Sequence, residues 1–229
     1  MDLSDELRGS NFACWCHALE RALCSGSLPG PSAQRRMAPR PRRLNPAASE
    51  GTPRQGSVLL LLHPDHNGIC LPVTLRSERV AYHKSQISLP GGTKERDDVT
   101  LLDTALRETS EEIGIRRDDV RVLGKLTPLY VPASHSCIHP YVACHPAKPM
   151  YRINPDEVAE VIELPLQTLM DPRWTIEEEW EIQGQLVRVP FYQLGRHKVW
   201  GATAMILSEL AALLADAPGL AHSPNPRAC

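Results

Sequence analysis

The clearest hydrophobic pattern in the chain lies just before Ile115. Apolar and small side chains recur there at helical spacing, at Leu102, Ala105, Leu106, Thr109 and Ile113. Thr100 or Asp103 is a suitable N-cap for a helix, and Gly114 stands where a glycine commonly ends one. The pattern therefore predicts an amphipathic helix between these two signals, with one buried face.

Short apolar runs predict strands on both sides of this helix. They lie at residues 57–62, 69–75, 120–126, 129–131 and 137–144, and a hairpin is expected at 174–182 and 186–191. A last helix ends near Ala215, with Ile206, Leu210, Leu213 and Leu214 at core spacing. Several strands around one strongly marked helix, followed by a second long helix, favour an α+β fold or an α/β/α sandwich.

The two ends of the chain differ from this middle part. Residues 1–26 can form a helix, in which Phe12, Trp15, Leu19 and Leu23 share a face and Ser10 or Asn11 caps the start. We expect this helix to dock on the domain or on a partner chain. Residues 27–55 are rich in proline and arginine, which is typical of a linker. The sequence thus predicts three parts: helix plus linker at 1–55, a domain at 56–216 and a flexible tail at 217–229.

Composition narrows the class of protein. The 229 residues suit one domain with extensions or at most two small ones, and a net charge of −2 provides no global attraction for nucleic acid or membranes. Seven cysteines without a Cys-x-x-Cys spacing argue against a disulfide scaffold and for a reducing compartment. The longest apolar run, residues 58–62, is too short to span a bilayer. We therefore expect a cytoplasmic protein with no nucleic-acid or membrane partner, and the sequence leaves a homodimer open.

Three carboxylates are stacked on one side of the predicted helix. Glu108, Glu111 and Glu112 stand at positions i, i+3 and i+4, so they lie within about one turn of each other. Like charges at this spacing destabilise a helix by a few tenths of a kcal/mol per pair, and the helix dipole disfavours anions near its C-terminus. A hard cation such as Mg²⁺ or Mn²⁺ would remove this penalty. The alternative is an ordinary solvated acidic face.

Residues 107–115, Arg-Glu-Thr-Ser-Glu-Glu-Ile-Gly-Ile, resemble the second half of the Nudix box, Arg-Glu-apolar-x-Glu-Glu-x-Gly-apolar. Gly91 and Gly92 resemble the opening of that box. The usual spacing would place a glycine at position 93 and a glutamate at position 99, where this chain has threonine and valine. Asp98 is the candidate replacement for the glutamate, in a loop that is one residue longer.

The resemblance implies a Nudix-type α/β/α sandwich with a mixed sheet and hydrolysis of a phosphoanhydride. It implies Mg²⁺ or Mn²⁺ on Glu108, Glu111 and Glu112, which are also catalytic residues together with Arg107. Arg107 is expected to hold a carboxylate in place by a bidentate contact. The general base is a glutamate of the box or one of Glu157 and Glu160, and the sequence does not decide between them.

Residues 71–92 carry a second resemblance. They are similar to the motif that precedes the Nudix box in coenzyme A pyrophosphatases, Leu-Leu-Thr-x-Arg-Ser-x3-Arg-x3-Gly-x3-Phe-Pro-Gly-Gly. The positions that fit are Thr74, Arg76, Ser77, Pro90, Gly91 and Gly92, whereas Ala81, Ser85 and Leu89 replace an arginine, a glycine and a phenylalanine. Arg79, His83 and Lys84 are cations near the replaced arginine. The substrate-binding candidates are Arg76, Ser77, Lys84, Gly91 and Gly92.

This second resemblance implies cleavage of coenzyme A or acyl-coenzyme A to 3′,5′-ADP and (acyl-)4′-phosphopantetheine. Cations near the glycine loop suit a substrate that carries a pyrophosphate and a 3′-phosphate. Two alternatives stay open. One is a Nudix hydrolase of ADP-ribose or another nucleoside diphosphate derivative, and the other is a Nudix module that binds a nucleotide without cleaving it.

A separate tract has the residue types of a soft-metal site. It contains His135, Cys137, His139, Cys144 and His145. The first three would share one face of a strand, so a zinc site is one interpretation. Buried free cysteines and exposed histidines are the ordinary interpretation.

Overall fold

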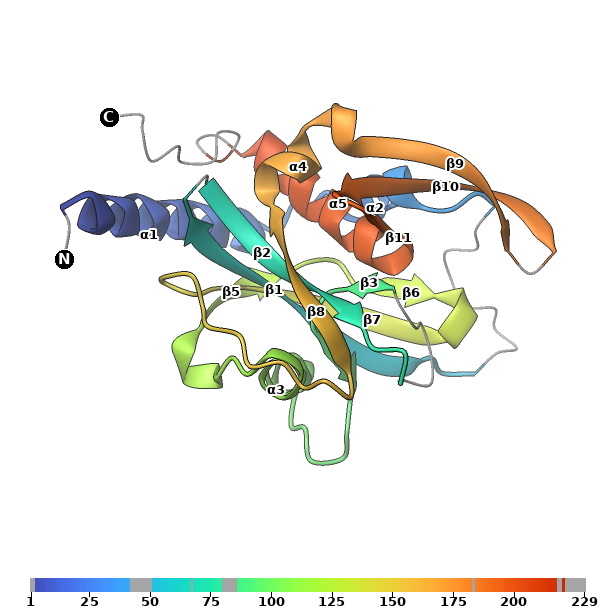
Figure 1. Ribbon diagram of the computed structural model, residues 1–229, viewed down its shortest axis with the longest axis horizontal. Helices are drawn as coiled ribbons and strands as arrows, with labels where there is room; N and C mark the ends of the chain where they lie inside the picture. Colours follow the sequence, from blue (N-terminus) through green and yellow to red (C-terminus); the bar gives the residue numbers. More distant parts are fainter. Residues whose placement is uncertain are drawn as a thin grey trace.

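The computed structural model describes residues 3–41, 51–66, 68–79, 86–182, 184–217 and 220. They form a large mixed sheet, a smaller antiparallel sheet and helices on both faces of the large sheet (Figure 1). The fold is thus the α/β/α sandwich with a mixed sheet that the sequence predicts. Within the described ranges, no helix combines the length and the apolar character needed to cross a membrane.

Strand β1 (Arg54–Asp65) is the centre of the large sheet. It runs antiparallel to β2 (Gly68–Arg76) and β4 (Gly91–Thr93), and parallel to β7 (Ser136–Cys144). Strand β2 also pairs with β3 (Ile87–Ser88) and β8 (Val158–Pro165), and β7 with β5 (Arg121–Lys125) and β6 (Leu129–Val131). All the strands expected around the first helix are present, because their apolar runs meet in this sheet.

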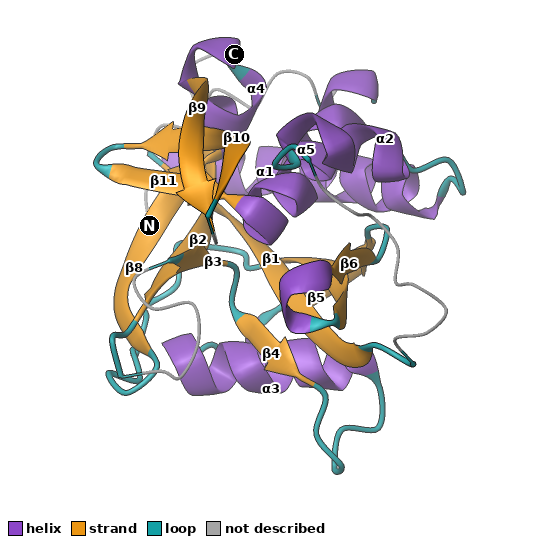
Figure 2. Cartoon of the chain, turned by 90° about the vertical axis from the view of Figure 1, so that its right-hand side faces the viewer, coloured by secondary structure: helices purple, strands orange, loops and turns teal. Residues whose placement is uncertain are grey.

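Helix α3 (Leu101–Ile113) covers one face of the sheet by itself (Figure 2). The other face carries α1 (Leu3–Cys24), α2 (Gly30–Gln34), α4 (Leu166–Met170), α5 (Gly201–Asp216) and the small sheet of β9 (Thr175–Ile182), β10 (Gln185–Leu194) and β11 (His197–Trp200). Short 3-10 turns lie at Arg35–Met37, Arg117–Asp119, Pro132–Ser134 and Pro172–Trp174.

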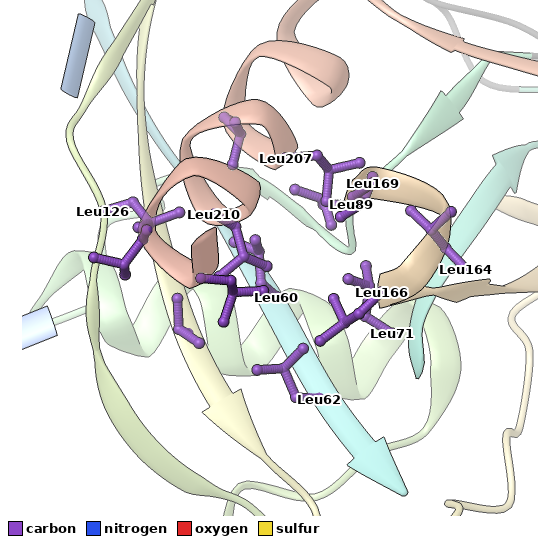
Figure 3. Packing of buried hydrophobic residues seen from close by; sticks show 14 of the residues in the cluster. Leu60, Leu62, Leu71, Leu89, Leu126, Leu164, Leu166, Leu169, Leu207 and Leu210 are labelled. Atoms are coloured by element: carbon purple, nitrogen blue, oxygen red, sulfur yellow. The ribbon is translucent and has the colours of Figure 1, made fainter. Parts of the chain in front are cut away.

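The core lies on both faces of β1. Leu60 and Leu62 belong to the larger cluster, where they meet leucines of α4 and α5 (Figure 3). Leu59 and Leu61 belong to the smaller cluster, which includes Ala105 on α3. Alternate side chains of a strand point to opposite faces, so β1 is apolar at successive positions because it is covered on both sides. Burying each leucine contributes about 2 kcal/mol.

The ends of α3 follow the sequence signals. Thr100 is the N-cap, and its hydroxyl accepts a hydrogen bond from the Asp103 amide at 3.2 Å. The Asp103 carboxylate accepts one from the Thr100 amide at 2.8 Å, which completes a capping box. Gly114 ends the helix in the left-handed conformation, with φ 75°. The helix is therefore fixed at both ends by its own local sequence.

Helix α1 docks on the domain, as one of the two expected alternatives. Phe12, Trp15, Leu19 and Leu23 are all buried in the larger cluster. The predicted cap is wrong, because the helix begins at Leu3 rather than after Ser10 or Asn11.

The segment predicted as a linker is packed over part of its length. Residues 30–37 form α2 and a 3-10 turn that contact α5, and Gln34 donates a hydrogen bond to the buried Glu209 carboxylate at 2.8 Å. The backbone amides of Gly30 and Thr127 donate to the same carboxylate. This part is therefore not a spacer. Residues 42–50 and most of the predicted flexible tail lie outside the described residues, and Leu220 is buried.

Candidate active site

Three carboxylates converge between α3 and the start of β8. They belong to Glu108, Glu112 and Glu157, and one oxygen from each lies within 4.8 Å of the others. Glu108 and Glu112 share a helix face because they are four residues apart. Glu157 comes from the turn that precedes β8, 45 residues further along the sequence than Glu112. The alternative residue Glu160 instead pairs with Arg196, at 3.2 Å.

Glu111 is not part of this cluster, although the sequence predicted it as a ligand. Its side chain is half exposed and lies 2.9 Å from Nη1 of Arg107. This ion pair at spacing i, i+4 holds the Glu111 carboxylate at the helix surface, outside the group of three. Of the predicted trio, the structure brings together two members and replaces the third by Glu157.

Arg107 holds a carboxylate by a bidentate contact, as expected. Its Nε and Nη2 atoms donate to the two carboxylate oxygens of Asp98, both at 3.0 Å. Its Nη2 atom also lies 3.1 Å from Glu108. Arg107 therefore connects the helix to the preceding loop and holds one carboxylate oxygen of Glu108.

Asp98 is the candidate replacement for the glutamate that the usual box spacing would place at position 99, and in the structure it is the carboxylate that Arg107 holds. It is buried and accepts further hydrogen bonds from the Thr104 hydroxyl and the Glu95 amide, each at 2.9 Å. The hydrogen bonds from Arg107 hold the pKa of Asp98 far below its usual range, and these other donors act in the same direction. The carboxylate is thus ionised and fully paired.

Glu112 is in the opposite electrostatic situation. Only 2% of the residue is exposed, and its Oε2 atom has no hydrogen-bond partner among the described residues. Burial raises the pKa of Glu112 to about 8; Arg76 opposes the shift, and Glu108 and Glu157 add to it. Burial also raises the pKa of Glu108, against the effect of Arg107. A buried carboxylate without compensation is costly.

This donor set fits a divalent cation. The ligand atoms are all carboxylate oxygens, which Mg²⁺ and Mn²⁺ prefer, and the orphaned Oε2 atom of Glu112 would gain a partner. The cation would also supply the positive charge that the buried cluster lacks. The chemistry of the site therefore favours a hard metal ion over a soft one.

The paired glycines make room for one of these carboxylates. A Cβ atom on Gly92 would lie 2.3 Å from Oε1 of Glu108, so any side chain there would displace the glutamate. Gly91 lies against the backbone of β1, with which it pairs through Val58. The glycine loop thus packs directly against the site, in addition to its expected role in phosphate binding.

Two of the predicted substrate-binding residues lie beside the cluster. Nη1 of Arg76 is 3.7 Å from Oε1 of Glu112, and Nε of Arg76 is buried without a hydrogen-bond partner in the described part of the chain. The Ser77 amide donates to the Glu157 carbonyl at 2.9 Å. Lys84 lies outside the described residues, as do Ala81, His83 and Ser85.

The histidine and cysteine tract forms no metal site in the described ranges, where the glutamate cluster is the one group with ligand spacing. His139 contacts the Gln55 side chain at 2.8 Å, and His145 contacts the Ala147 carbonyl at 2.6 Å. Each ring thus has its own local partner.

The chain is similar in sequence to known proteins. A family model described as the NUDIX domain matches residues 53–186. An uncharacterized Nudix hydrolase NudL from Pectobacterium atrosepticum is 34% identical over 169 residues, which cover 72% of this chain and 85% of that protein. The NudL of Photorhabdus laumondii is 33% identical over 183 residues, which cover 78% and 91%.

Among solved structures, a MutT/nudix family protein from Enterococcus faecalis is 17% identical, with a TM-score of 0.49. The match covers 73% of this chain and 63% of that one, which is less than two thirds of its length. The residues matched by the family model include the large sheet, α3 and the glutamate cluster. The chain therefore belongs to the Nudix family, and its enzyme class is that of the Nudix pyrophosphohydrolases.

Proposed function

We propose that the protein hydrolyses the pyrophosphate bond of coenzyme A or acyl-coenzyme A. The products are 3′,5′-ADP and (acyl-)4′-phosphopantetheine. The observation that carries this proposal is the position of Arg76, whose guanidinium lies 3.7 Å from a carboxylate of the glutamate cluster. Arg76 and Ser77 belong to the segment that resembles the coenzyme A motif, so the geometry supports a role for that segment at the site.

Glu108, Glu112 and Glu157 would hold the divalent cation. When bound, Mg²⁺ or Mn²⁺ supplies charge neutralisation for the pyrophosphate and activation of water as a nucleophile. Ions of this type are usually bound by a few carboxylates together with substrate phosphates, which suits a cluster of three glutamates. Glu111 serves as an ion-pair partner of Arg107 in this proposal.

Two arginines have the other roles: one orients a metal ligand and one binds the substrate. Arg107 keeps Glu108 in place through contacts to Asp98 and Glu108 itself. Arg76 is partly exposed and its guanidinium lies beside the cluster, so its terminal donors could bind a phosphate oxygen of the substrate.

A charged substrate with several phosphates also suits the cations around the site. Arg79 lies two residues beyond Ser77 and is exposed, with Asp156 as its ion-pair partner at 2.8 Å. An exposed pair of this kind is weak, so a phosphate could replace the carboxylate at little cost. The 3′-phosphate of coenzyme A is the group that distinguishes it from ADP-ribose in such an environment.

Product analysis tests the proposal. Coenzyme A, ADP-ribose and NADH are incubated separately with the protein and Mg²⁺, and the products are separated by chromatography. We expect 3′,5′-ADP from coenzyme A and little turnover of the other two. Preferred cleavage of ADP-ribose or NADH would retain the Nudix chemistry and remove the coenzyme A assignment. Binding of nucleotide without any product would favour the non-catalytic module.

A further inference from the structure

Glu157 lies at the end of the loop between β7 and β8, and this loop is bound to the large sheet at a point before Glu157. Near its middle, the Tyr151 hydroxyl donates to Oε1 of Glu163 at 2.9 Å and lies 3.2 Å from Nε2 of His63. His63 is completely buried on β1. The large sheet therefore anchors the loop several residues ahead of Glu157.

The next residues of the loop are bound to the C-terminal end of α3. The Arg152 amide donates to the Ile113 carbonyl at 2.9 Å, and the Asn154 amide donates to the Glu112 carbonyl at 3.0 Å. The last carbonyls of a helix have no partner within the helix, so they are free to accept these bonds. Glu112 thus contributes twice, with its carboxylate in the cluster and its carbonyl under the loop that carries Glu157.

This contact requires a glycine at the helix end. A Cβ atom on Gly114 would lie 2.6 Å from Cβ of Arg152 and 3.0 Å from its carbonyl oxygen. Such distances are shorter than van der Waals contact, and the carbonyl oxygen belongs to the backbone, which cannot rotate away. Any larger residue at position 114 would therefore displace the loop, in addition to straining the left-handed backbone there.

Asn154 then forms the turn that presents Glu157. Its side-chain oxygen accepts from the Asp156 amide at 3.2 Å, as in an Asx turn. Its carbonyl accepts from the amides of Glu157 and Val158, at 3.1 and 2.8 Å. The Glu157 carbonyl in turn accepts from Ser77 on the other side. The backbone of Glu157 is consequently fixed at both its amide and its carbonyl.

We infer that Asn154 and Gly114 are positioning residues for metal binding, because they couple the end of α3 to the turn that places Glu157 beside Glu108 and Glu112. The inference rests on the metal-binding part of the proposed function and does not depend on which nucleotide is the substrate. Residues that orient metal ligands commonly change metal affinity by about 10- to 100-fold when they are removed.

Titration of the purified protein with Mn²⁺, followed by electron paramagnetic resonance, tests this inference without an activity assay. Asn154→Ala removes the side-chain oxygen, and we expect the affinity for Mn²⁺ to fall about tenfold. Asn154→Asp keeps an acceptor in the same place, and we expect it to retain most of the affinity. Thermal unfolding of each variant verifies that it is folded at the temperature of the titration.

The decisive comparison is with the ligand itself. If Asn154 acts through Glu157, the double variant Asn154→Ala/Glu157→Gln should bind Mn²⁺ as weakly as Glu157→Gln alone. If the loss of affinity in the double variant equals the product of the losses in the two single variants, the inference is overturned, because Asn154 then affects the site by a route other than Glu157.

A pair of glycines gives a matched control for Gly114. Gly184 has nearly the same left-handed φ, +74° against +75°, but an added Cβ would meet nothing within 4 Å. Alanine at either position strains the backbone equally, whereas only Gly114→Ala pushes against Arg152. We expect about tenfold weaker Mn²⁺ binding in Gly114→Ala and unchanged binding in Gly184→Ala. Equal effects in both variants would contradict a positioning role for Gly114.

The two levels of the proposal fail in different ways. Absence of Mn²⁺ binding in the wild-type protein would remove the metal site and this inference together. Tight binding that Glu157→Gln weakens and that Asn154→Ala and Gly114→Ala leave intact would remove only the positioning role. If the wild-type protein does not hydrolyse coenzyme A but all the Mn²⁺ affinities are as expected, only the substrate assignment is wrong.

Discussion

Asp98, in the loop before α3, and Glu112, on α3 itself, are two buried carboxylates with different surroundings. Asp98 accepts hydrogen bonds from Arg107, Thr104 and the Glu95 amide. Glu112 is more deeply buried, lies beside two other glutamates and keeps one oxygen without a partner among the described residues. The pKa of Asp98 is lowered, whereas the pKa of Glu112 is raised to about 8.

The difference separates structural from functional carboxylates. Removing one partner of a buried, fully paired charge destabilises the fold, whereas a buried carboxylate oxygen with no hydrogen-bond partner among the described residues can accept a ligand. Sequence position alone does not distinguish them, because both residues belong to the same box-like segment. Their hydrogen-bond and ion-pair partners distinguish the two carboxylates, and each residue can be substituted separately.

The largest expected effect is on turnover. Glu112→Gln keeps the size of the side chain but removes its charge, so we expect the rate of Mg²⁺-dependent hydrolysis to fall about 10³-fold, equivalent to about 4 kcal/mol. Glu111→Gln is the matched control on the same helix, and its rate should stay within about tenfold of wild type. Steady-state kinetics with the substrate identified by product analysis measures both. Equal losses would show that the comparison is wrong.

The next largest effect is on stability, which should depend more on Asp98 than on Glu112. Asp98→Asn leaves Arg107 without its bidentate partner, so we expect the free energy of unfolding to decrease by about 3 kcal/mol. Burial raises the pKa of Glu112 to about 8, so the group is largely protonated at neutral pH without a metal, and Glu112→Gln should be neutral or slightly stabilising in the presence of a chelator. Urea unfolding at neutral pH with EDTA gives both values. A large destabilisation by Glu112→Gln would mean that the chain does compensate this carboxylate.

With a bound metal ion, Glu112→Gln should become less stable than wild type. At a Mg²⁺ or Mn²⁺ concentration of about 100 times Kd, binding to the native state stabilises a protein by about 2.7 kcal/mol. We expect this gain in wild type and in Asp98→Asn when the variant is folded, and its loss in Glu112→Gln. Differential scanning fluorimetry with and without the ion measures the shift. A gain that survives in Glu112→Gln would place the ion elsewhere.

The smallest effect is the pH dependence of stability. A carboxylate whose pKa is lowered by folding stabilises the protein above its unfolded pKa of about 4, and this contribution is lost as the pH falls. Between pH 5 and pH 3, wild type should therefore lose about 1 kcal/mol more than Asp98→Asn. Urea unfolding at the two pH values tests the sign. A wild type that loses less than the variant would contradict it.

Local signals in the sequence predicted the helix that carries the site. The capping pair Thr100 and Asp103, the terminal Gly114 and the spacing of Glu108 and Glu112 all act within one or two turns, so they can be read directly. Strand positions were also predictable, because apolar runs covered on both faces are distinctive.

Long-range contacts account for most of what the sequence did not predict. Glu111 is the exception: its spacing suits a ligand, and in the structure it pairs with Arg107, four residues before it on the same helix. Glu157 was only one of two alternatives, because the distinction depends on the turn at Asn154 and on how it meets α3. The packed part of the predicted linker depends on Glu209, which lies about 175 residues away in the sequence. No local pattern reports such contacts.

A crystal structure of the protein with Mn²⁺ tests the central claim most directly, because the anomalous signal of manganese locates the ion independently of the protein. We predict a peak bound by the carboxylates of Glu108, Glu112 and Glu157, with Glu111 still paired to Arg107. A peak bound by Glu111 and remote from Glu157 would contradict the assignment of Glu108, Glu112 and Glu157 as the metal site.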